Sequence, residues 1–396
     1  MAVTEVTSEN WFSRIVESIK GILVGILIFL IAFPVLFWNE GRAVKTARSL
    51  SEGAAAVVSV AADQVNGTFD GKEIHIQGEA TTSETLSDST FGVTLPAIKL
   101  TRDVEMYQWK QKESTKTKKK VGGGTQKVTT YSYEKVWSDQ AIASDSFKEP
   151  GHDNPGALPF PSKTQVASLV TVGAFKLSPG LIGQIDKWED LRVDQQNLGL
   201  TSPDVRDKLQ ISDGRYYLGT DPTTPTIGDV HISFRVVKPT EVSIVAQQDG
   251  SQLKPYATQQ AGYDIELLEL GDVSAKDMFK AAQSRNSMLT WILRGVGFVM
   301  MFIGLFMVGR PLAIVGDFIP VIGSFFRVGV GLFAGLLALG FSFITIAVAW
   351  IFYRPLIGIL LLSVGVLFLF GLVALAVTVG RRRKKTPEPA PEPEAT

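Results

Sequence analysis

The most conspicuous residues that could do chemistry are lysines placed next to glycines. Lys116, Lys118, Lys119 and Lys120 precede three consecutive glycines at 122–124, an arrangement that could hold a phosphate or a nucleic acid. A phosphate-binding P-loop has glycines before its lysine and a helix after it, whereas here the lysines come first and the strand-like run KVTTYSY follows. This order excludes a P-loop. It predicts the tip of a hairpin that joins VEMYQWK to KVTTYSYEKVW.

The three histidines are the next candidates for catalysis or metal binding. His75 and His231 alternate with apolar neighbours in EIHIQ and HISFRVV, which is typical of exposed strand positions. His152 stands beside Asp153 in a run rich in proline and glycine, where a structural turn is favoured over an oriented catalytic base. The chain has no cysteine and no fingerprint of a known catalytic site. We therefore predict no enzymatic activity, no catalytic residue, no cofactor site and no metal site.

Four apolar runs determine where these candidates lie. A membrane-spanning helix needs about 20 mostly apolar residues, and four runs meet this requirement: 21–38, 288–308, 328–353 and 354–379. The first run ends in Phe37 and Trp38 rather than in the small residues of a cleavage site, which favours an uncleaved anchor over a signal peptide. The sequence therefore predicts an α-helical four-span membrane protein in contact with the lipid bilayer.

Basic residues predict the orientation of the spans. The run RRRKK follows the fourth span and places residues 380–396, which end in a disordered Pro/Glu tail, in the cytoplasm. Four spans then place residues 1–20 and 309–327 on the same side. Residues 309–327 contain Asp317 and two prolines, which favours an interfacial or re-entrant segment over a fifth span. Residues 39–287 are predicted to lie outside the cytoplasm, since long domains translocate despite their charge.

Residues 39–287 show the two-residue periodicity of strands, interrupted by short helices. The pairs Ser178-Pro179 and Ser202-Pro203 are typical helix starts, and Ser274 is predicted to cap a helix that leads into the second span. Residues 39–53 are predicted to form a juxtamembrane helix that ends at a glycine. The predicted fold is therefore a large strand-rich α+β extracytoplasmic domain, with one core or two, inserted between spans 1 and 2.

Three residues within the spans are site candidates. Arg294 lies about 9 Å from the outer start of the second span. It is predicted to snorkel to the headgroups, with a lipid phosphate or a carboxylate of the extracytoplasmic domain as the alternative partner. Gly331 and Gly335 have the spacing of a helix-packing motif, either within the bundle or between copies of the chain.

The lysine run has two readings once it is placed outside the cytoplasm. One is a solvated, mobile loop, and the other is contact with anionic lipid or a cell-envelope polymer. Binding to nucleic acid is not predicted, because no aromatic residue stands between the lysines and the formal net charge of the chain is zero.

Seven motifs, taken in order from Trp38 to about Tyr353, resemble the TMEM43 family, also called LUMA. They are WNEGRAVKTARSLSEG, VEMYQW, TTYSYEKVW, GHDNP, GDVHISF, RNSMLTWILRGVG and FYRPL. The resemblance implies a multi-pass membrane protein with a large extracytoplasmic or lumenal domain, no established enzymatic activity, self-association, and a role in organising envelope complexes. It places animal members in the endoplasmic reticulum and inner nuclear membrane. The missing cysteines, the Pro/Glu tail and the Lys/Gly loop depart from the family and suggest a bacterial member in the inner cell membrane.

These observations together predict a function. We expect a non-enzymatic multi-pass membrane scaffold that forms homo-oligomers and organises membrane or envelope protein complexes, with its other partners unidentified. The alternatives are a transporter or channel component, and a lipid-domain organiser in which residues 310–327 sense lipid packing. Spans 3 and 4 lack the charged residues that usually mark an ion path, which disfavours the transporter.

Overall fold

The computed structural model describes residues 3–259, 262–317, 320–360 and 363. The predicted fourth span is described only at 354–360 and 363, and residues 380–396, which include RRRKK and the Pro/Glu tail, lie outside the described residues. The chain divides into two compact units. The sheet unit comprises Met1–Val16, Lys45–Ser287 and Ile314–Ser324, and the helix unit comprises Glu17–Val44, Met288–Ala313 and Phe325–Thr396.

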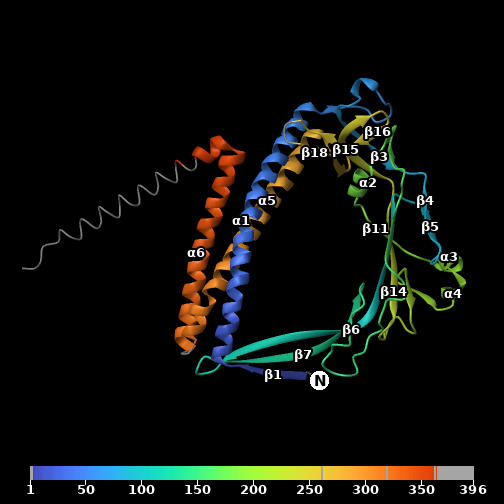
Figure 1. The fold of residues 1–396 in the computed structure, drawn as a ribbon. Coiled ribbons are helices and arrows are strands. Elements are labelled where there is room, and N and C mark those ends of the chain that lie inside the picture. Colours follow the sequence, from blue (N-terminus) through green and yellow to red (C-terminus); the bar gives the residue numbers. More distant parts are fainter. Residues whose placement is uncertain (1–2, 260–261, 318–319, 361–362, 364–396) are drawn as a thin grey trace, which may run out of the picture. The chain divides into compact units, whose positions relative to one another are not determined.

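Three long helices contain the apolar runs (Figure 1): α1 (Trp11–Ala56), α5 (Ala275–Gly316) and α6 (Pro320–Tyr353). Within the described residues, all three are long and apolar enough to cross a membrane. This confirms the apolar helices and the strand-rich domain between the first two, while the fourth span and the side of the domain stay predictions. The segment predicted as a separate juxtamembrane helix at 39–53 is instead the continuation of α1, which passes through Gly53 and ends at Ala56.

The segment 309–327 is helical at both ends. Helix α5 continues through Pro311 to Gly316 and is capped by Asp317, and α6 begins at Pro320. The two prolines that suggested breaks are both accommodated, since Pro311 lies inside a helix and Pro320 lies at a first helical position, where the missing N–H has no cost. The position of this segment relative to a membrane stays a prediction.

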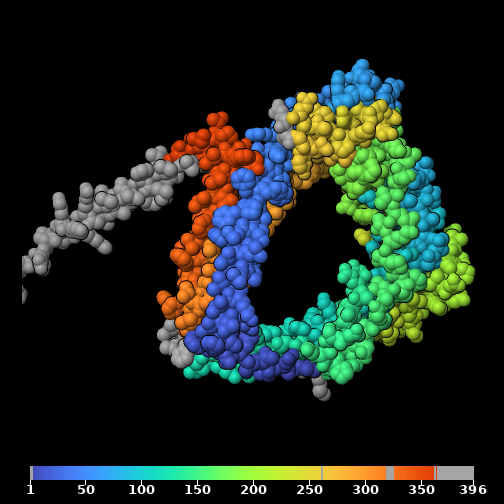
Figure 2. Space-filling view, viewed as in Figure 1, coloured from blue at the N-terminus to red at the C-terminus, as the bar shows by residue number. Residues whose placement is uncertain are grey.

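The larger of the two main sheets has eight strands, and every pair in it is antiparallel. Its strands are β1 (Val3–Glu9), β6 (Lys99–Lys119), β7 (Thr125–Ser138), β8 (Lys163–Val166), β11 (Glu189–Leu191), β12 (Leu209–Ser212), β13 (Arg215–Leu218) and β14 (Val230–Val237). The order is β1-β7-β6-β14-β13-β12, with β11 beside β14 and β8 beside β6. In Figure 2, β1 in dark blue lies along the β6–β7 hairpin in teal.

The second sheet has seven strands and contains a closed ring. Its strands are β2 (Val58–Ser59), β3 (Glu73–Thr81), β9 (Thr171–Val172), β10 (Phe175–Lys176), β15 (Thr240–Asp249), β16 (Gln252–Lys254) and β19 (Leu267–Leu270). The order is β19-β15-β16-β10-β9-β3-β2, and a further pairing between β15 and β3 closes the five strands from β15 to β3 into a ring. Two small hairpins, β4 (Thr85–Asp88) with β5 (Val93–Pro96) and β17 (Tyr256–Ala257) with β18 (Asp264–Ile265), complete the strands.

Short helices join the strands, and three of the predicted helix starts are confirmed. Helix α2 (Pro179–Gln184) is capped by Ser178, α4 (Pro203–Arg206) follows Ser202, and α5 is capped by Ser274, whose side chain accepts from the N–H of Asp277. Helix α3 (Gln195–Leu200) and the 3-10 turn η1 (Gly67–Phe69) complete this set. Proline at the first helical position explains why serine-proline pairs predicted these starts correctly.

The sheet unit contains two large hydrophobic cores and a smaller one. One core gathers around the seven-stranded sheet, with Ile74 and Ile244 among its buried residues, and the other lies on the eight-stranded sheet around Phe91 and Phe234. The smaller cluster packs Leu50 of α1 and Phe279 of α5 with residues of β15 and β18. The sequence left open whether the large domain has one core or two, and the structure shows two large ones. The smaller one joins the ends of two long helices to the seven-stranded sheet.

Candidate functional site

A carboxylate and a guanidinium meet within the helix unit. Arg294 on α5 donates from Nε to Glu40 Oε1 at 2.6 Å and from Nη2 to Glu40 Oε2 at 2.9 Å. The side chain of Glu40 is 2% exposed and that of Arg294 is 16% exposed. Two parallel hydrogen bonds are the strongest geometry for this pair, and the pairing explains how apolar helices tolerate both charges.

Two tryptophans surround this ion pair. Trp350 of α6 donates its Nε1–H to Glu40 Oε2 at 2.6 Å. The guanidinium of Arg294 lies over the ring of Trp291 at 4.7 Å and over the ring of Trp350 at 5.6 Å, both within the range of a cation–π interaction. Trp291 and Arg294 stand three residues apart on α5 and therefore share one helix face. All three long helices contribute to this arrangement, which we name the Glu40 cluster (Glu40, Trp291, Arg294 and Trp350).

A second set of hydrogen bonds lies next to the Glu40 cluster. Asn39, which is fully buried, donates from Nδ2 to the carbonyl of Thr290 at 3.1 Å. Arg42 donates from Nη2 to Thr290 Oγ1 at 3.0 Å. A side chain at Gly41 would place its Cβ 2.5 Å from the ring of Tyr353, so this position requires glycine. The run NEGR of α1 therefore supplies a buried amide at Asn39 and a carboxylate at Glu40. The next two positions supply space for the Tyr353 ring at Gly41 and a cation at Arg42.

The chemistry available to the Glu40 cluster is that of a structural lock. Both oxygens of Glu40 accept hydrogen bonds from charged or aromatic donors, so the carboxylate is neither an open base nor an available metal ligand in this conformation. Removing one member of a buried pair leaves the other charge without compensation, which is strongly destabilising. The cluster therefore links α1, α5 and α6 through one shared carboxylate.

Of the two partners proposed for Arg294, the structure provides a carboxylate, and contact of Arg294 with lipid headgroups stays a prediction. The carboxylate is that of Glu40 in α1, which lies within residues 39–287, the range predicted for the extracytoplasmic domain. Glu40 and Trp350 were not predicted as site residues. A sequence signal existed for Glu40, since it is a lone acid two residues beyond an apolar run, and an acid in that position needs a partner.

The backbones of α1 and α5 approach each other closely at two glycines that were not predicted as packing residues. A Cβ on Gly25 would lie 2.7 Å from the carbonyl oxygen of Gly304, and one on Gly304 would lie 2.6 Å from that of Gly25. Gly331 and Gly335, which were predicted to pack, face Phe306 and Phe302 of α5 at an ordinary 3.9 Å. Gly25 and Gly304 therefore permit a close crossing of α1 and α5, while the predicted pair contacts aromatic rings within the bundle.

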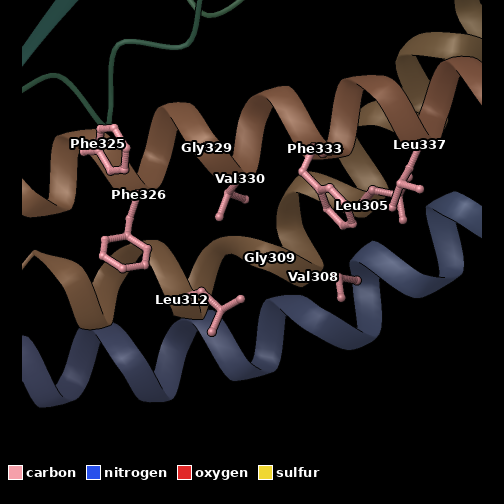
Figure 3. A pocket seen from close by; sticks show the side chains of 11 residues that line it. Leu305, Val308, Gly309, Leu312, Phe325, Phe326, Gly329, Val330, Phe333 and Leu337 are labelled. Atoms are coloured by element: carbon pink, nitrogen blue, oxygen red, sulfur yellow. The ribbon is translucent and has the colours of Figure 1, made fainter. Parts of the chain in front are cut away.

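An apolar groove of about 610 Å³ lies between α5 and α6 in the helix unit (Figure 3). Its lining includes Leu305, Val308 and Leu312 from α5, and Phe326, Val330 and Phe333 from α6. The lining is apolar throughout, which fits a surface that faces acyl chains.

The lysine run forms the hairpin tip that the sequence predicted. Strands β6 and β7 pair from Met106 with Ser138 to Lys119 with Thr125, and the amide of Lys120 donates to the carbonyl of Gly124 at 2.8 Å. Gly122 and Gly123 have φ angles of 89° and 78°, in the region that favours glycine. The side chains of the three lysines at 116, 118 and 120 are exposed.

Lys119 differs from these three lysines because it binds a buried carboxylate. Its Nζ lies 2.5 Å from Oδ1 of Asp317, which is fully buried and also accepts from Nη2 of Arg14 at 2.8 Å. Arg14 also donates to the carbonyl of Gly123. With β1 paired along β7, these contacts attach the hairpin tip to the first turns of α1 and to the end of α5. A solvated, mobile loop and a loop in contact with an anionic surface both stay predictions.

These contacts bear on the predicted membrane topology. They join residues from 1–20, 39–287 and 309–327, although the middle segment was assigned to the opposite side of the membrane from the other two. In this conformation the ion pairs bring together the hairpin tip, the first turns of α1 and the end of α5. The predicted sides of these segments stay predictions, and these contacts do not fit all of them at once.

His75 is buried, and both of its ring nitrogens lie within hydrogen-bond distance of a neighbouring residue. His75 is only 4% exposed, its Nδ1 lies 3.0 Å from Ser59 Oγ, and its Nε2 lies 3.0 Å from the carbonyl oxygen of Val273. The prediction that His75 is exposed was therefore wrong, because Val273 in the segment before α5 and Ser59 on the neighbouring strand β2 both contact its ring. Burial lowers the pKa of His75.

His152 and His231 both stack on aromatic rings of the eight-stranded sheet. His152 lies 3.9 Å from the ring of Tyr133, and His231 lies 3.6 Å from the ring of Trp137. Burial, followed by the charge of Arg215, lowers the pKa of His231. Within the described residues, no group of three or more His, Cys, Asp or Glu side chains is arranged to hold a metal.

Comparison with known proteins identifies the family. The profile of the family described as Transmembrane protein 43 matches residues 106–355. The chain is 38% identical over 369 residues to Transmembrane protein 43 of Mus musculus, a match that covers 89% of this chain and 90% of the relative. This chain belongs to the TMEM43 family. The corresponding identity is 37% over 366 residues for the Homo sapiens protein, covering 89% of each chain. For the Drosophila melanogaster homolog it is 30% over 351 residues, covering 87% of this chain and 91% of the relative.

Membership of the TMEM43 family confirms the resemblance that the seven motifs suggested. Three of those motifs, which contain Glu40, Arg294 and Tyr353, supply residues at or beside the Glu40 cluster. The relatives named above are animal proteins, and a bacterial origin stays a prediction. No solved structure matches this chain.

Proposed function

We propose that this TMEM43-family protein is a non-enzymatic, multi-pass membrane scaffold that self-associates and organises membrane or envelope protein complexes. The observation that carries the proposal is the Glu40 cluster. The cluster directs the charges of Glu40 and Arg294 toward each other and toward tryptophan rings, as a rigid anchor for a large folded domain requires. Four spans and an extracytoplasmic position for the large domain belong to the same proposal.

Two measurements on the same preparation distinguish a scaffold from a transporter or channel. The purified chain is reconstituted in nanodiscs for mass measurement and in liposomes for ion and solute flux. We expect a protein mass that is a multiple of 43.0 kDa, with flux equal to that of empty liposomes. Copurification from native membranes with crosslinking should then recover the same membrane proteins in repeated preparations.

Flux that Arg294→Leu abolishes would overturn the scaffold in favour of a transport pathway through the Glu40 cluster. The matched control is Arg285→Leu, on the same helix, because Arg285 lies in the sheet unit in an exposed pair with Glu269. A monomeric mass at all protein concentrations would contradict self-association alone.

The second candidate is a lipid-domain organiser, which two observations favour. The exposed lysines at 116, 118 and 120 lie close together on the hairpin tip, and the groove between α5 and α6 is apolar throughout. Each lysine near an anionic surface contributes up to about 1 kcal/mol. Replacing these three lysines by glutamine should therefore weaken the sedimentation of neutral-lipid nanodiscs with anionic vesicles by more than tenfold.

The control for this experiment replaces three exposed lysines elsewhere in the sheet unit, Lys163, Lys176 and Lys208, by glutamine. Lys119 stays unchanged, since its replacement would remove one of the two cations that pair with the buried carboxylate of Asp317. An equal weakening in both triple variants would show a general charge effect and exclude the hairpin tip as a specific contact.

A further inference from the structure

Glu73 is a buried carboxylate in a position that an ionised group does not ordinarily occupy. It begins β3 and is 1% exposed, and neither of its side-chain oxygens has a hydrogen-bond partner. A Cβ on Gly53, in the last turns of α1, would lie 2.8 Å from both carboxylate oxygens and 2.4 Å from Ile265. The carboxylate is therefore enclosed between the end of α1 and a strand of the small β17–β18 hairpin.

The surroundings of Glu73 oppose its ionisation. Burial, followed by the nearby charge of Glu52 on α1, raises the pKa of Glu73 to about 7. Tyr256 on β17 is the other titratable group on this side, and burial together with the charges of Glu73 and Glu52 raises its pKa. Across the ladder, Glu73 is paired with Gln247 of β15, which is uncharged. Burial and the charge of Glu52 therefore both favour the neutral form of Glu73.

The end of α1 depends on this neutral form. Leu50 packs in the smaller hydrophobic cluster with Val245, Ile265 and the first turns of α5, and Glu73 lies beside the same turn of α1. An ionised carboxylate in this position needs water or a cation, and the enclosed space admits neither without movement of the turn at Gly53. Ionisation and the packing of this turn are therefore coupled.

We propose that Glu73 is a proton-binding site that controls how the last turns of α1 pack against the seven-stranded sheet. When the proton is bound, the neutral carboxyl group fits beneath Gly53 and the turn stays packed. When the proton leaves to water, the carboxylate requires hydration and the turn around Gly53 opens. The protein thus carries an acid-stabilised joint where an apolar helix enters its large domain.

The direction of the effect follows from the two protonation states. An open, hydrated Glu73 ionises near the ordinary value of 4.5, and the packed one near 7. The packed turn is therefore favoured most below pH 4.5, and this preference falls about tenfold for each pH unit as the pH rises to about 7, above which it stays constant.

Amide hydrogen exchange of the full chain in detergent micelles tests this joint. Peptides that cover residues 50–58 and 72–76 are followed between pH 5 and 8.5, and each rate is divided by the intrinsic rate at that pH. We expect the corrected exchange to rise about tenfold per unit up to pH 7 and then to level off. Peptides from the core of the eight-stranded sheet, at 100–106, should not change.

Three variants make the test decisive. Glu73→Gln should remove the pH dependence at 50–58, and Glu79→Gln, at an exposed position on the same strand, should leave it intact. Glu52→Gln removes the neighbouring charge and should move the plateau to lower pH, which keeps the proposal testable if the Glu73 variant does not fold. A flat profile in the wild-type chain, or the wild-type profile in Glu73→Gln, would overturn the proposal.

Discussion

Glu40 and Glu73 are both almost completely buried, at 2% and 1% exposure, but they differ in their hydrogen-bond partners. Glu40, in the helix unit, accepts hydrogen bonds from Arg294 and Trp350. Glu73, in the sheet unit, accepts none. The ionised carboxylate of Glu40 holds three helices together through its partners. The carboxylate of Glu73 has no such partner and, by our proposal, binds a proton instead.

The physical reason for the difference is the medium that each group would otherwise meet. A charge on an apolar helix has no water nearby, so it requires a partner within the protein at all times. Glu73 lies against the last turns of α1, and by our proposal movement of this one turn admits solvent to its carboxylate. Only the second position permits titration without loss of the fold.

The largest expected effect comes from breaking the Glu40 pair. Arg294→Met should lower the free energy of unfolding in detergent by about 3–5 kcal/mol, because it leaves the Glu40 carboxylate buried without its cation. Chemical denaturation followed by tryptophan fluorescence measures the loss. Glu40→Met should give a similar value by leaving the guanidinium without its anion.

The double variant Glu40→Met with Arg294→Met then decides whether the effect belongs to the pair. It should recover most of the stability lost in either single variant, since two apolar side chains can replace a buried ion pair at little cost. If the two losses simply add, the side chains act independently and the Glu40 cluster is not a lock.

Trp350→Phe should have a smaller effect on the same cluster. The substitution keeps the apolar ring contact but removes the N–H that donates to Glu40 Oε2 at 2.6 Å. A hydrogen bond to a charged group contributes about 1.5–3 kcal/mol, which is the expected loss in the same denaturation experiment. In a background that already carries Glu40→Met, the substitution should have almost no effect, and an unchanged loss there would assign it to ring packing.

The sequence predicted the elements around both carboxylates better than it predicted their partners. Apolar length predicted the three long helices, and glycines after the lysine run predicted the β6–β7 hairpin, because both signals are local. The pairing of Glu40 with Arg294 spans 254 positions and depends on how α1 crosses α5, which no local pattern specifies. The motifs identified the correct segments without revealing that they meet.

Burial was predicted poorly wherever a strand is covered on both faces. The alternation in EIHIQ correctly placed Ile74 and Ile76 in the core but assigned His75 to solvent. The second face of β3 meets the end of α1 at Glu73 and the segment before α5 at His75, so two-residue periodicity could not reveal that these two residues are buried. The unpaired carboxylate therefore became visible only in three dimensions.

Glycine packing gives the third test, because the Glu40 cluster requires α1 and α5 to approach closely. Gly25→Ala places a methyl group 2.7 Å from the carbonyl oxygen of Gly304 and should cost about 1–2 kcal/mol, as overpacking does. Gly331→Ala is the matched control, since its new methyl group would lie 3.9 Å from Phe306. Equal losses of denaturation free energy in the two variants would show that the crossing at Gly25 is not the limiting contact.

The smallest and most informative effect is a gain rather than a loss. Because the folded state raises the pKa of Glu73 above its ordinary value, to about 7, the charge of Glu73 destabilises the fold increasingly as the pH rises from 4.5 to 7. Glu73→Gln should therefore change thermal stability little at pH 5 and increase it by about 1 kcal/mol at pH 8, after allowance for water reaching the site. Glu84→Gln should show the opposite sign, since hydrogen bonds from Ser168 lower the pKa of Glu84, and its stabilising contribution is lost as the pH falls. Thermal unfolding of the three proteins between pH 4.5 and 8.5 measures both trends. A Glu73→Gln variant that is destabilised equally at every pH would show that this carboxylate, like that of Glu40, is held by a partner.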